Sequence, residues 1–159
     1  DNKHMAEPAK VIKHVKWYAD YYTAVTGKQT PPDGLIRMSE AVYNFQRIFN
    51  LKMGFGQREH DNIPYRAMGP VKVVEYESRA ERYDKLLVEK HNVDITGKTT
   101  EEKIILLRGF RETLYEKLKD AVYHRRGWTN NGIPTVETVT RLGIDFPEVL
   151  ELLRAHGVE

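Results

Sequence analysis

The chain has 159 residues, of which 25 are Lys or Arg, 23 are Asp or Glu and none is Cys. This length suits one domain with a real core, and the near balance of charge excludes the strong positive field that attracts nucleic acid. Without cysteine the chain alone cannot form a disulfide, a thiolate nucleophile or a Cys-ligated zinc or iron–sulfur site. No apolar run approaches a transmembrane segment and no signal-peptide pattern is present, so we expect a cytoplasmic protein.

Apolar residues recur with helical spacing from the start of the chain. Pro8 opens a first expected helix, which Gly27 ends. Its apolar face comprises Val11, Val15, Tyr18, Tyr22 and Val25. A turn over 30–34 then precedes a second helix, which ends at Gly54. Its apolar stripe comprises Leu35, Met38, Val42, Phe45 and Phe49, with Ile48 alongside.

A third and weaker helix is expected over about 73–91. One side of it carries Tyr76, Ala80, Tyr83 and Leu87, and the other side carries alternating acidic and basic residues. The alternation is typical of a solvated, paired helix face rather than of an acid–base dyad. Thr99 and Glu102 form a capping-box pattern, which opens the strongest helix over roughly 100–126.

The last part of the chain predicts two short helices. Thr135 can cap a helix that ends at Leu142, and Asp145 with Glu148 can cap a helix that starts at Pro147. We find no confident strand and no internal repeat. The sequence therefore predicts an all-α fold in which about six helices form an irregular orthogonal bundle, as a single helical domain over 1–159.

Residues 55–72 form the main irregular segment, and an irregular loop of this length is uncommon in a small helical domain. The candidate side chains in it are Arg58, His60, Asp61 and Arg66. Two interpretations remain open. The segment is either a salt-bridged loop that ties two helices together, or a loop that lines a cleft, a channel or a subunit interface.

Other polar patterns favour ordinary structural roles. The six histidines show no metal-ligand spacing, and the sequence contains neither a phosphate-binding glycine loop nor a GxSxG elbow. Lys10, Lys13 and Lys16 beside Trp17 fit the solvated face of the first helix better than a nucleic-acid surface. We therefore expect no metal site within this chain and no nucleic-acid partner.

Two ordered stretches carry a family resemblance. The first covers 42–55 and includes Arg-Ile-Phe-Asn at 47–50, with Arg58, Asp61 and Pro64 behind it; the second is Arg-Gly-Trp-Thr-Asn-Asn-Gly-Ile-Pro-Thr at 126–135. In this order they resemble the C-terminal helical part of the tungsten-dependent aldehyde ferredoxin oxidoreductase family. The resemblance covers most of 18–145. Within the family, the long segment 73–126 is most similar to the tungsten subunit of class II benzoyl-coenzyme A reductase.

The resemblance implies that this chain is the C-terminal domain of a larger multidomain enzyme. The whole enzyme would hold a bis-tungstopterin cofactor and a [4Fe–4S] cluster, neither ligated by this chain alone, which by itself would be inactive. The chain starts about where the family's last cluster cysteine lies, and so the cofactor motif is expected upstream. The implied partners are the remaining domains, an iron–sulfur electron-transfer subunit or ferredoxin, and the substrate.

The resemblance leaves two reactions open. A benzoyl-coenzyme A reductase would reduce its aromatic acyl-CoA to a cyclic dienoyl-CoA, and an aldehyde ferredoxin oxidoreductase would oxidise an aldehyde to a carboxylate. In either enzyme Arg58, His60, Asp61 and Arg66 would lie near the channel or a domain interface. An alternative of another class is a non-catalytic helical module that offers an apolar helix face to a partner helix.

Overall fold

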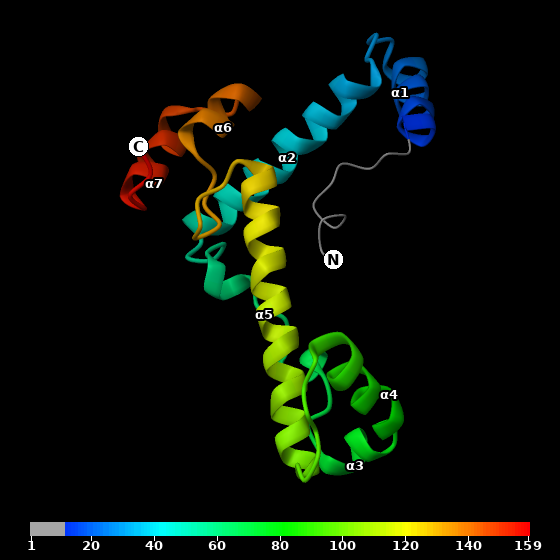
Figure 1. The fold of residues 1–159 in the computed structure, drawn as a ribbon. Coiled ribbons are helices and arrows are strands. Elements are labelled where there is room, and N and C mark those ends of the chain that lie inside the picture. The colour runs from blue at the N-terminus through cyan, green and yellow to red at the C-terminus, as the bar shows by residue number, and fades with distance from the viewer. Residues whose placement is uncertain (1–11) are drawn as a thin grey trace. The chain divides into compact units, whose positions relative to one another are not determined.

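The computed structural model describes the backbone from Ile12 and the side chains from His14 to the end of the chain. The expected helix start at Pro8, together with Val11, therefore lies outside the described residues. Figure 1 shows a chain built from helices and short helical turns. In chain order these are α1 (Ile12–Thr26), α2 (Pro32–Lys52), η2 (Arg58–Asp61), η3 (Tyr65–Met68), α3 (Val73–Glu77), α4 (Ala80–Lys85), η4 (Leu86–Lys90), α5 (Thr100–Arg126), α6 (Val136–Leu142) and α7 (Pro147–Ala155).

The all-α prediction is confirmed. Within 12–159 the sole extended pairing is an isolated bridge between Trp128 and Pro134. None of the helices in that range is long and apolar enough to cross a membrane. The two short 3₁₀ helices η2 and η3 lie inside the segment 55–72 that the sequence marks as irregular.

The described chain forms two compact units. The first comprises the residues up to Asp61 together with those from Asp120 onward, and the second comprises 62–119. Helix α5 crosses the boundary, so its first part belongs to the second unit and its last turns to the first. The single domain over 1–159 stays a prediction.

The core of the first unit is formed by α2, α6, α7 and the segments that join them. Its buried side chains are Ile48, Leu51, Ile133, Val139, Leu142, Ile144, Val149, Leu153 and Val158. Helix α2 contributes Ile48 and Leu51 from a face that also buries Asn44 and Arg47. These four positions follow the i, i+3, i+4, i+7 spacing of one helix face.

The expected stripe of α2 lies mostly outside this core. Met38, Val42, Phe45 and Phe49 all remain exposed, Val42 by 60% and Phe49 by 56%. Helix α2 therefore has two faces suited to packing, and the mixed polar and apolar face is the buried one. Asn44 and Arg47 tolerate burial because their polar atoms find partners, as the next subsection shows.

Residues 62–119 build the second unit around two tyrosines. Its core comprises Tyr76, Tyr83, Leu87, Ile104 and Leu107, which confirms the apolar side expected for 73–91. The expected continuous helix over 73–91 is wrong, because the chain breaks between α3 and α4. There the Ser78 hydroxyl donates to the Glu75 carbonyl at 2.9 Å, and Arg79 leaves the helical region at φ −140°. Such side-chain bonding to the backbone competes with helix continuation.

Capping predictions are confirmed at two helix starts. The Thr99 amide donates to the Glu102 carboxylate at 2.7 Å, and the Glu102 amide donates to the Thr99 hydroxyl at 3.3 Å. The Thr138 amide donates to the Thr135 hydroxyl at the start of α6. The predicted Asp145 cap is wrong, because α7 has Phe146 at its N-cap position and Pro147 in its first turn. Proline starts a helix without a side-chain cap because it lacks the amide that would need a partner.

Gly127 ends α5 in a position that only glycine suits. Its φ is +67°, and a Cβ atom built there would lie 2.1 Å from the Thr138 hydroxyl oxygen. The hydroxyls of Thr135 and Thr138 both donate to the Gly127 carbonyl, at 2.9 and 2.8 Å. The backbone conformation and the close threonine therefore both require the missing side chain.

We predict that Gly127→Ala lowers the free energy of unfolding by about 2–4 kcal/mol, from left-handed strain and the clash with Thr138. Gly109→Ala is the matched control, because Gly109 lies within α5 with open space around its Cα. That control should gain about 0.5–1 kcal/mol, since alanine favours the helix. Urea unfolding followed by circular dichroism measures both variants. Equal effects of the two substitutions would contradict the role given to Gly127.

An ion pair joins α2 to α6. Arg141 donates to both carboxylate oxygens of Glu40, at 3.2 and 2.7 Å. The Arg141 hydrogen bond holds the pKa of Glu40 below its usual value of 4.5. Arg37 adds a bond to the Arg141 carbonyl at 2.7 Å.

The depressed pKa of Glu40 predicts an acid-dependent contribution to stability. The pair contributes fully above pH about 4.5, where the carboxylate is ionised in both states, and the contribution is lost as the pH falls through the folded-state pKa. Because the Arg141 side chain is half exposed, we expect at most about 1 kcal/mol. Urea unfolding of Glu40→Gln and the parent should differ at pH 7, and the difference should shrink as the pH falls below 4.5. A difference that did not change with pH would show that the charge is not responsible.

Candidate functional site

A charged pair inside the first unit lies at the centre of the candidate site. Arg47 of α2 donates from Nη1 and Nη2 to the two carboxylate oxygens of Asp61, at 2.8 and 2.6 Å. The Arg47 side chain is 10% exposed and the Asp61 side chain 29%. Two parallel bonds to one carboxylate fix both the distance and the orientation of the partners. The pair therefore fixes the end of η2 against α2.

Tyr123 of α5 supplies a third hydrogen bond to Asp61. Its hydroxyl donates to Oδ2 of Asp61 at 2.5 Å. Burial and the neighbouring Asp61 carboxylate both raise the pKa of Tyr123 far above its ordinary value. The tyrosine therefore stays protonated and acts as a permanent donor. The carboxylate of Asp61 accepts all three hydrogen bonds and so joins α2, η2 and α5.

The turn after α5 closes over the same arginine. The Nε atom of Arg47 donates to the Gly132 carbonyl at 2.9 Å, and the Arg47 guanidinium lies 4.7 Å from the Trp128 ring centroid. The indole Nε1 of Trp128 donates to Asn44 Oδ1 at 2.7 Å. Gly132 has φ +76°, and a Cβ there would lie 2.4 Å from Nη2 of Arg47. Glycine is therefore required where the turn meets the guanidinium.

Arg58 ties the loop to the end of α5 at a more exposed position. Its Nη1 atom contacts Oδ1 of Asp120 at 2.7 Å and the Asn130 carbonyl at 3.0 Å. Its backbone amide donates to the Asn131 carbonyl at 2.9 Å. The Asp120 side chain is 60% exposed. Charge attraction here is screened by water, so the backbone contacts define the position of the loop.

The other two candidates from the sequence have separate surroundings. His60 lies edge-on to the Phe55 ring at 5.4 Å, and its Nδ1 accepts from the Gln57 amide at 3.3 Å. Arg66 belongs to the second unit, where it pairs with Glu75. Arg58 and Asp61 both contact Tyr123 within the first unit, Arg58 with its guanidinium 5.6 Å from the ring centroid and Asp61 through the hydroxyl. A channel or interface role for all four residues stays a prediction.

The described residues do not fit a metal centre. No group of three or more His, Cys, Asp or Glu side chains that could hold a metal ion occurs among them. The chain also has no cysteine for an iron–sulfur cluster. Ligands of such a cluster would have to come from outside these 159 residues.

A comparison with protein-family models matches residues 4–144 to the model described as aldehyde ferredoxin oxidoreductase, domains 2 and 3. The match spans most of the chain, and the protein therefore belongs to the aldehyde ferredoxin oxidoreductase family. Searches of curated proteins and of solved structures gave no match.

The family resemblance and the charged network coincide. Arg47, Asp61, Trp128 and Gly132 belong to the two ordered stretches by which the sequence resembles the family, and all four meet in one place. Arg47 and Trp128 lie in those stretches, but the sequence pattern indicates no role for either. Tyr123 lies outside them, and a tyrosine on a helix carries no pattern that reveals a distant carboxylate.

We predict that Asp61→Ala lowers the free energy of unfolding by about 3 kcal/mol, because it leaves the buried Arg47 charge without its carboxylate. Asp120→Ala is the matched control on the exposed pair with Arg58, and it should cost less than about 1 kcal/mol. Thermal and urea unfolding measure both variants.

A double variant gives a second check on the pair. Once Arg47 is replaced by Met, the further change Asp61→Ala should cost far less than it does alone, because the two residues act together. Additive losses in this cycle would contradict the coupling that we derive from the geometry.

Proposed function

We propose that this protein is the C-terminal part of a tungsten-dependent oxidoreductase, and specifically of the catalytic subunit of a class II benzoyl-coenzyme A reductase. Membership of the aldehyde ferredoxin oxidoreductase family supports the general class. The observation that favours the reductase concerns 62–119, which is a compact unit of its own and includes most of the segment that looks longer than in ordinary aldehyde oxidoreductases.

The first and last residues of that unit lie next to each other, as in a segment inserted into a loop of another domain. Asn62, its first residue, accepts a hydrogen bond from Lys119, its last residue, at 2.8 Å. On the other side of the boundary, Asp61 and Tyr123 bond each other at 2.5 Å. Adjacent entry and exit points allow a unit to be inserted without disturbing the parent fold. The bonds support the view that 62–119 is an addition to the family's helical domain.

The exposed apolar side chains of the first unit support the remaining domains as partners. Tyr18, Val42, Phe45 and Phe49 are each about half exposed or more. Contiguous apolar surface of this kind is typical of a face that another protein surface covers. In the whole enzyme, this chain would help to exclude water and shape the path to the metal, while the cofactors supply the redox chemistry.

The enzyme proposed here would reduce the ring of benzoyl-coenzyme A to a cyclic dienoyl-coenzyme A, with electrons from an iron–sulfur subunit or ferredoxin. Oxidation of an aldehyde to a carboxylate is the second candidate, and the matching family model takes its description from enzymes of that name. On either reaction we expect a cytoplasmic enzyme.

The proposal predicts both metal content and substrate. The complete gene product, produced anaerobically with tungstate, should contain tungsten and iron by elemental analysis. It should oxidise a reduced viologen dye when benzoyl-coenzyme A is added. Aldehyde-dependent dye reduction without the acyl-CoA reaction would favour the second candidate, and absence of both metals would overturn the proposed class.

The Arg58→Ala variant of the complete product tests the loop. Turnover or substrate affinity should fall at least fivefold if the loop lines the channel or a domain interface. Lys85→Ala, on the exposed face of α4, is the control and should leave both unchanged. Unchanged turnover, affinity and stability in Arg58→Ala would remove the functional interpretation of 55–66.

A further inference from the structure

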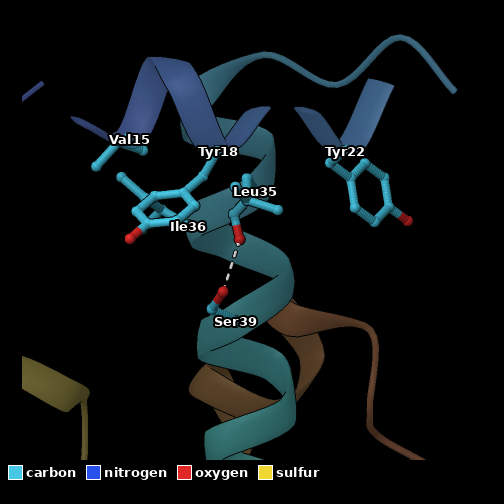
Figure 2. A pocket seen from close by; sticks show the side chains of 6 residues that line it. All are labelled: Val15, Tyr18, Tyr22, Leu35, Ile36 and Ser39. Carbon is cyan, nitrogen blue, oxygen red and sulfur yellow. Dashed lines mark hydrogen bonds between the residues drawn. The ribbon is translucent and has the colours of Figure 1, made fainter. Parts of the chain in front are cut away.

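An apolar groove runs along α1 and α2 in the first unit. A hollow of about 510 Å³ lies where the two helices meet, and Figure 2 shows the side chains around it. They are Val15, Tyr18 and Tyr22 of α1 with Leu35, Ile36 and Ser39 of α2. A second hollow of about 360 Å³ continues along α2 and shares Leu35 and Ser39 with the first. We call the two hollows together the α1–α2 groove.

The spacing of the groove residues is that of a seam between helices. On α2 the positions 35, 38, 42, 45 and 49 alternate steps of three and four, and on α1 the positions 15, 18, 22 and 25 do the same. A mean step of 3.5 residues keeps a side-chain row in contact with a neighbouring helix along its length. Both rows therefore suit a helical partner better than an extended peptide.

The lining of the second hollow has the arrangement of sockets for such a partner. Leu35, Met38, Ser39 and Val42 are spaced i, i+3, i+4 and i+7. Ser39, Val42, Tyr43 and Gln46 repeat that spacing one turn further along. Four residues in this arrangement form the hole that receives one side chain of a packed helix. The hollow thus offers two successive holes on α2.

The exposed area matches a protein interface. Tyr18, Tyr43, Phe45 and Phe49 are 67, 45, 46 and 56% exposed. At 150–250 Å² per aromatic side chain, these four alone leave on the order of 400 Å² in water. Ile36, Met38 and Val42, each at least 43% exposed, bring the face toward the roughly 800 Å² that one partner buries in a stable complex.

Ser39, Ala41 and Gln46 flank the α2 row and carry no charge, whereas a basic side chain lies beside the second hollow. The Arg126 guanidinium lies 3.8 Å from the ring centroid of Tyr43, which lines the second hollow. An incoming helix with uncharged flanks and an acidic side chain opposite Arg126 would match this distribution.

We propose that the α1–α2 groove receives an amphipathic α-helix with large apolar side chains three and four residues apart and one acidic residue beside Arg126. The helix comes from the rest of the same enzyme, and this part of the proposal rests on the proposed function. Binding places the apolar rows of both helices in contact with the partner's apolar stripe and removes them from water.

The groove is tested first on the 159-residue chain with a designed 21-residue peptide. The peptide carries Leu at alternating steps of three and four, Gln at the flanks and one Glu; its control has the same composition with Leu at every second position. Calorimetry should give at least tenfold weaker binding for the control peptide. Equal binding of both peptides would overturn the proposal, because a nonspecific apolar surface would bind peptides of the same composition equally, whatever the spacing of their Leu residues.

Variants of the chain test whether the designed peptide binds in the α1–α2 groove. Val42→Lys lies in the groove at a 60% exposed position, so it should keep the fold and weaken binding of the designed peptide at least tenfold. Ile105→Lys replaces a 70% exposed apolar residue of α5 in the second unit and should change nothing. Circular dichroism confirms folding of both. Equal weakening by the two variants would overturn the assignment to α1 and α2.

The source of the helix is tested in the complete gene product. A photoreactive benzophenone amino acid at position 42, with one at 105 as control, is cross-linked and the joined peptides are identified by mass spectrometry. A link from 42 to a segment of the same polypeptide with the stated apolar spacing supports the proposal. A link to α2 of a second copy, or to a segment without that spacing, overturns it. A link to such a helix in a separate protein would overturn the assignment of the helix to the same polypeptide, whereas the proposed function is tested separately by metal content and substrate.

Discussion

The bond between Arg47 and Asp61 is the constraint on which the first unit depends. A buried guanidinium is tolerated only when a carboxylate and further acceptors surround it, and Arg47 has Asp61, the Gly132 carbonyl and the face of Trp128. Asp61 comes from the loop after α2, whereas Gly132 and Trp128 both come from the turn after α5. Satisfying one charge therefore fixes the second helix, the loop behind it and the turn after α5 in a single arrangement.

The same constraint explains why α2 leaves its apolar row in water. A helix has only one face to offer the core, and burying Arg47 with its partners commits that face to Asn44, Ile48 and Leu51. The apolar row that includes Val42 and Phe49 therefore stays outside the core and is exposed to solvent. Sequence periodicity cannot decide between two such faces, because it counts apolar residues and not the distant partners that make a polar face buriable.

The predictable parts of the fold are those whose causes are local. The capping box at Thr99 and Glu102 and the Thr135 cap depend on residues three positions apart, so both could be found from the sequence. The break at Ser78 also has a local cause, but a serine inside a helical pattern is too common to signal one. The bond from Tyr123 to Asp61 spans 62 positions and no local pattern encodes it.

The residues that identify the family do not by themselves decide the reaction. The stretches that identify the family include the residues that hold the first unit together, namely Arg47, Asp61, Trp128 and Gly132. The contacts of this network hold segments of the chain against one another, and such a scaffold is compatible with more than one reaction. The network alone therefore does not select between an aromatic thioester and an aldehyde. Within this chain, the unit formed by 62–119 and the exposed row on α2 are the parts that the network leaves free to differ.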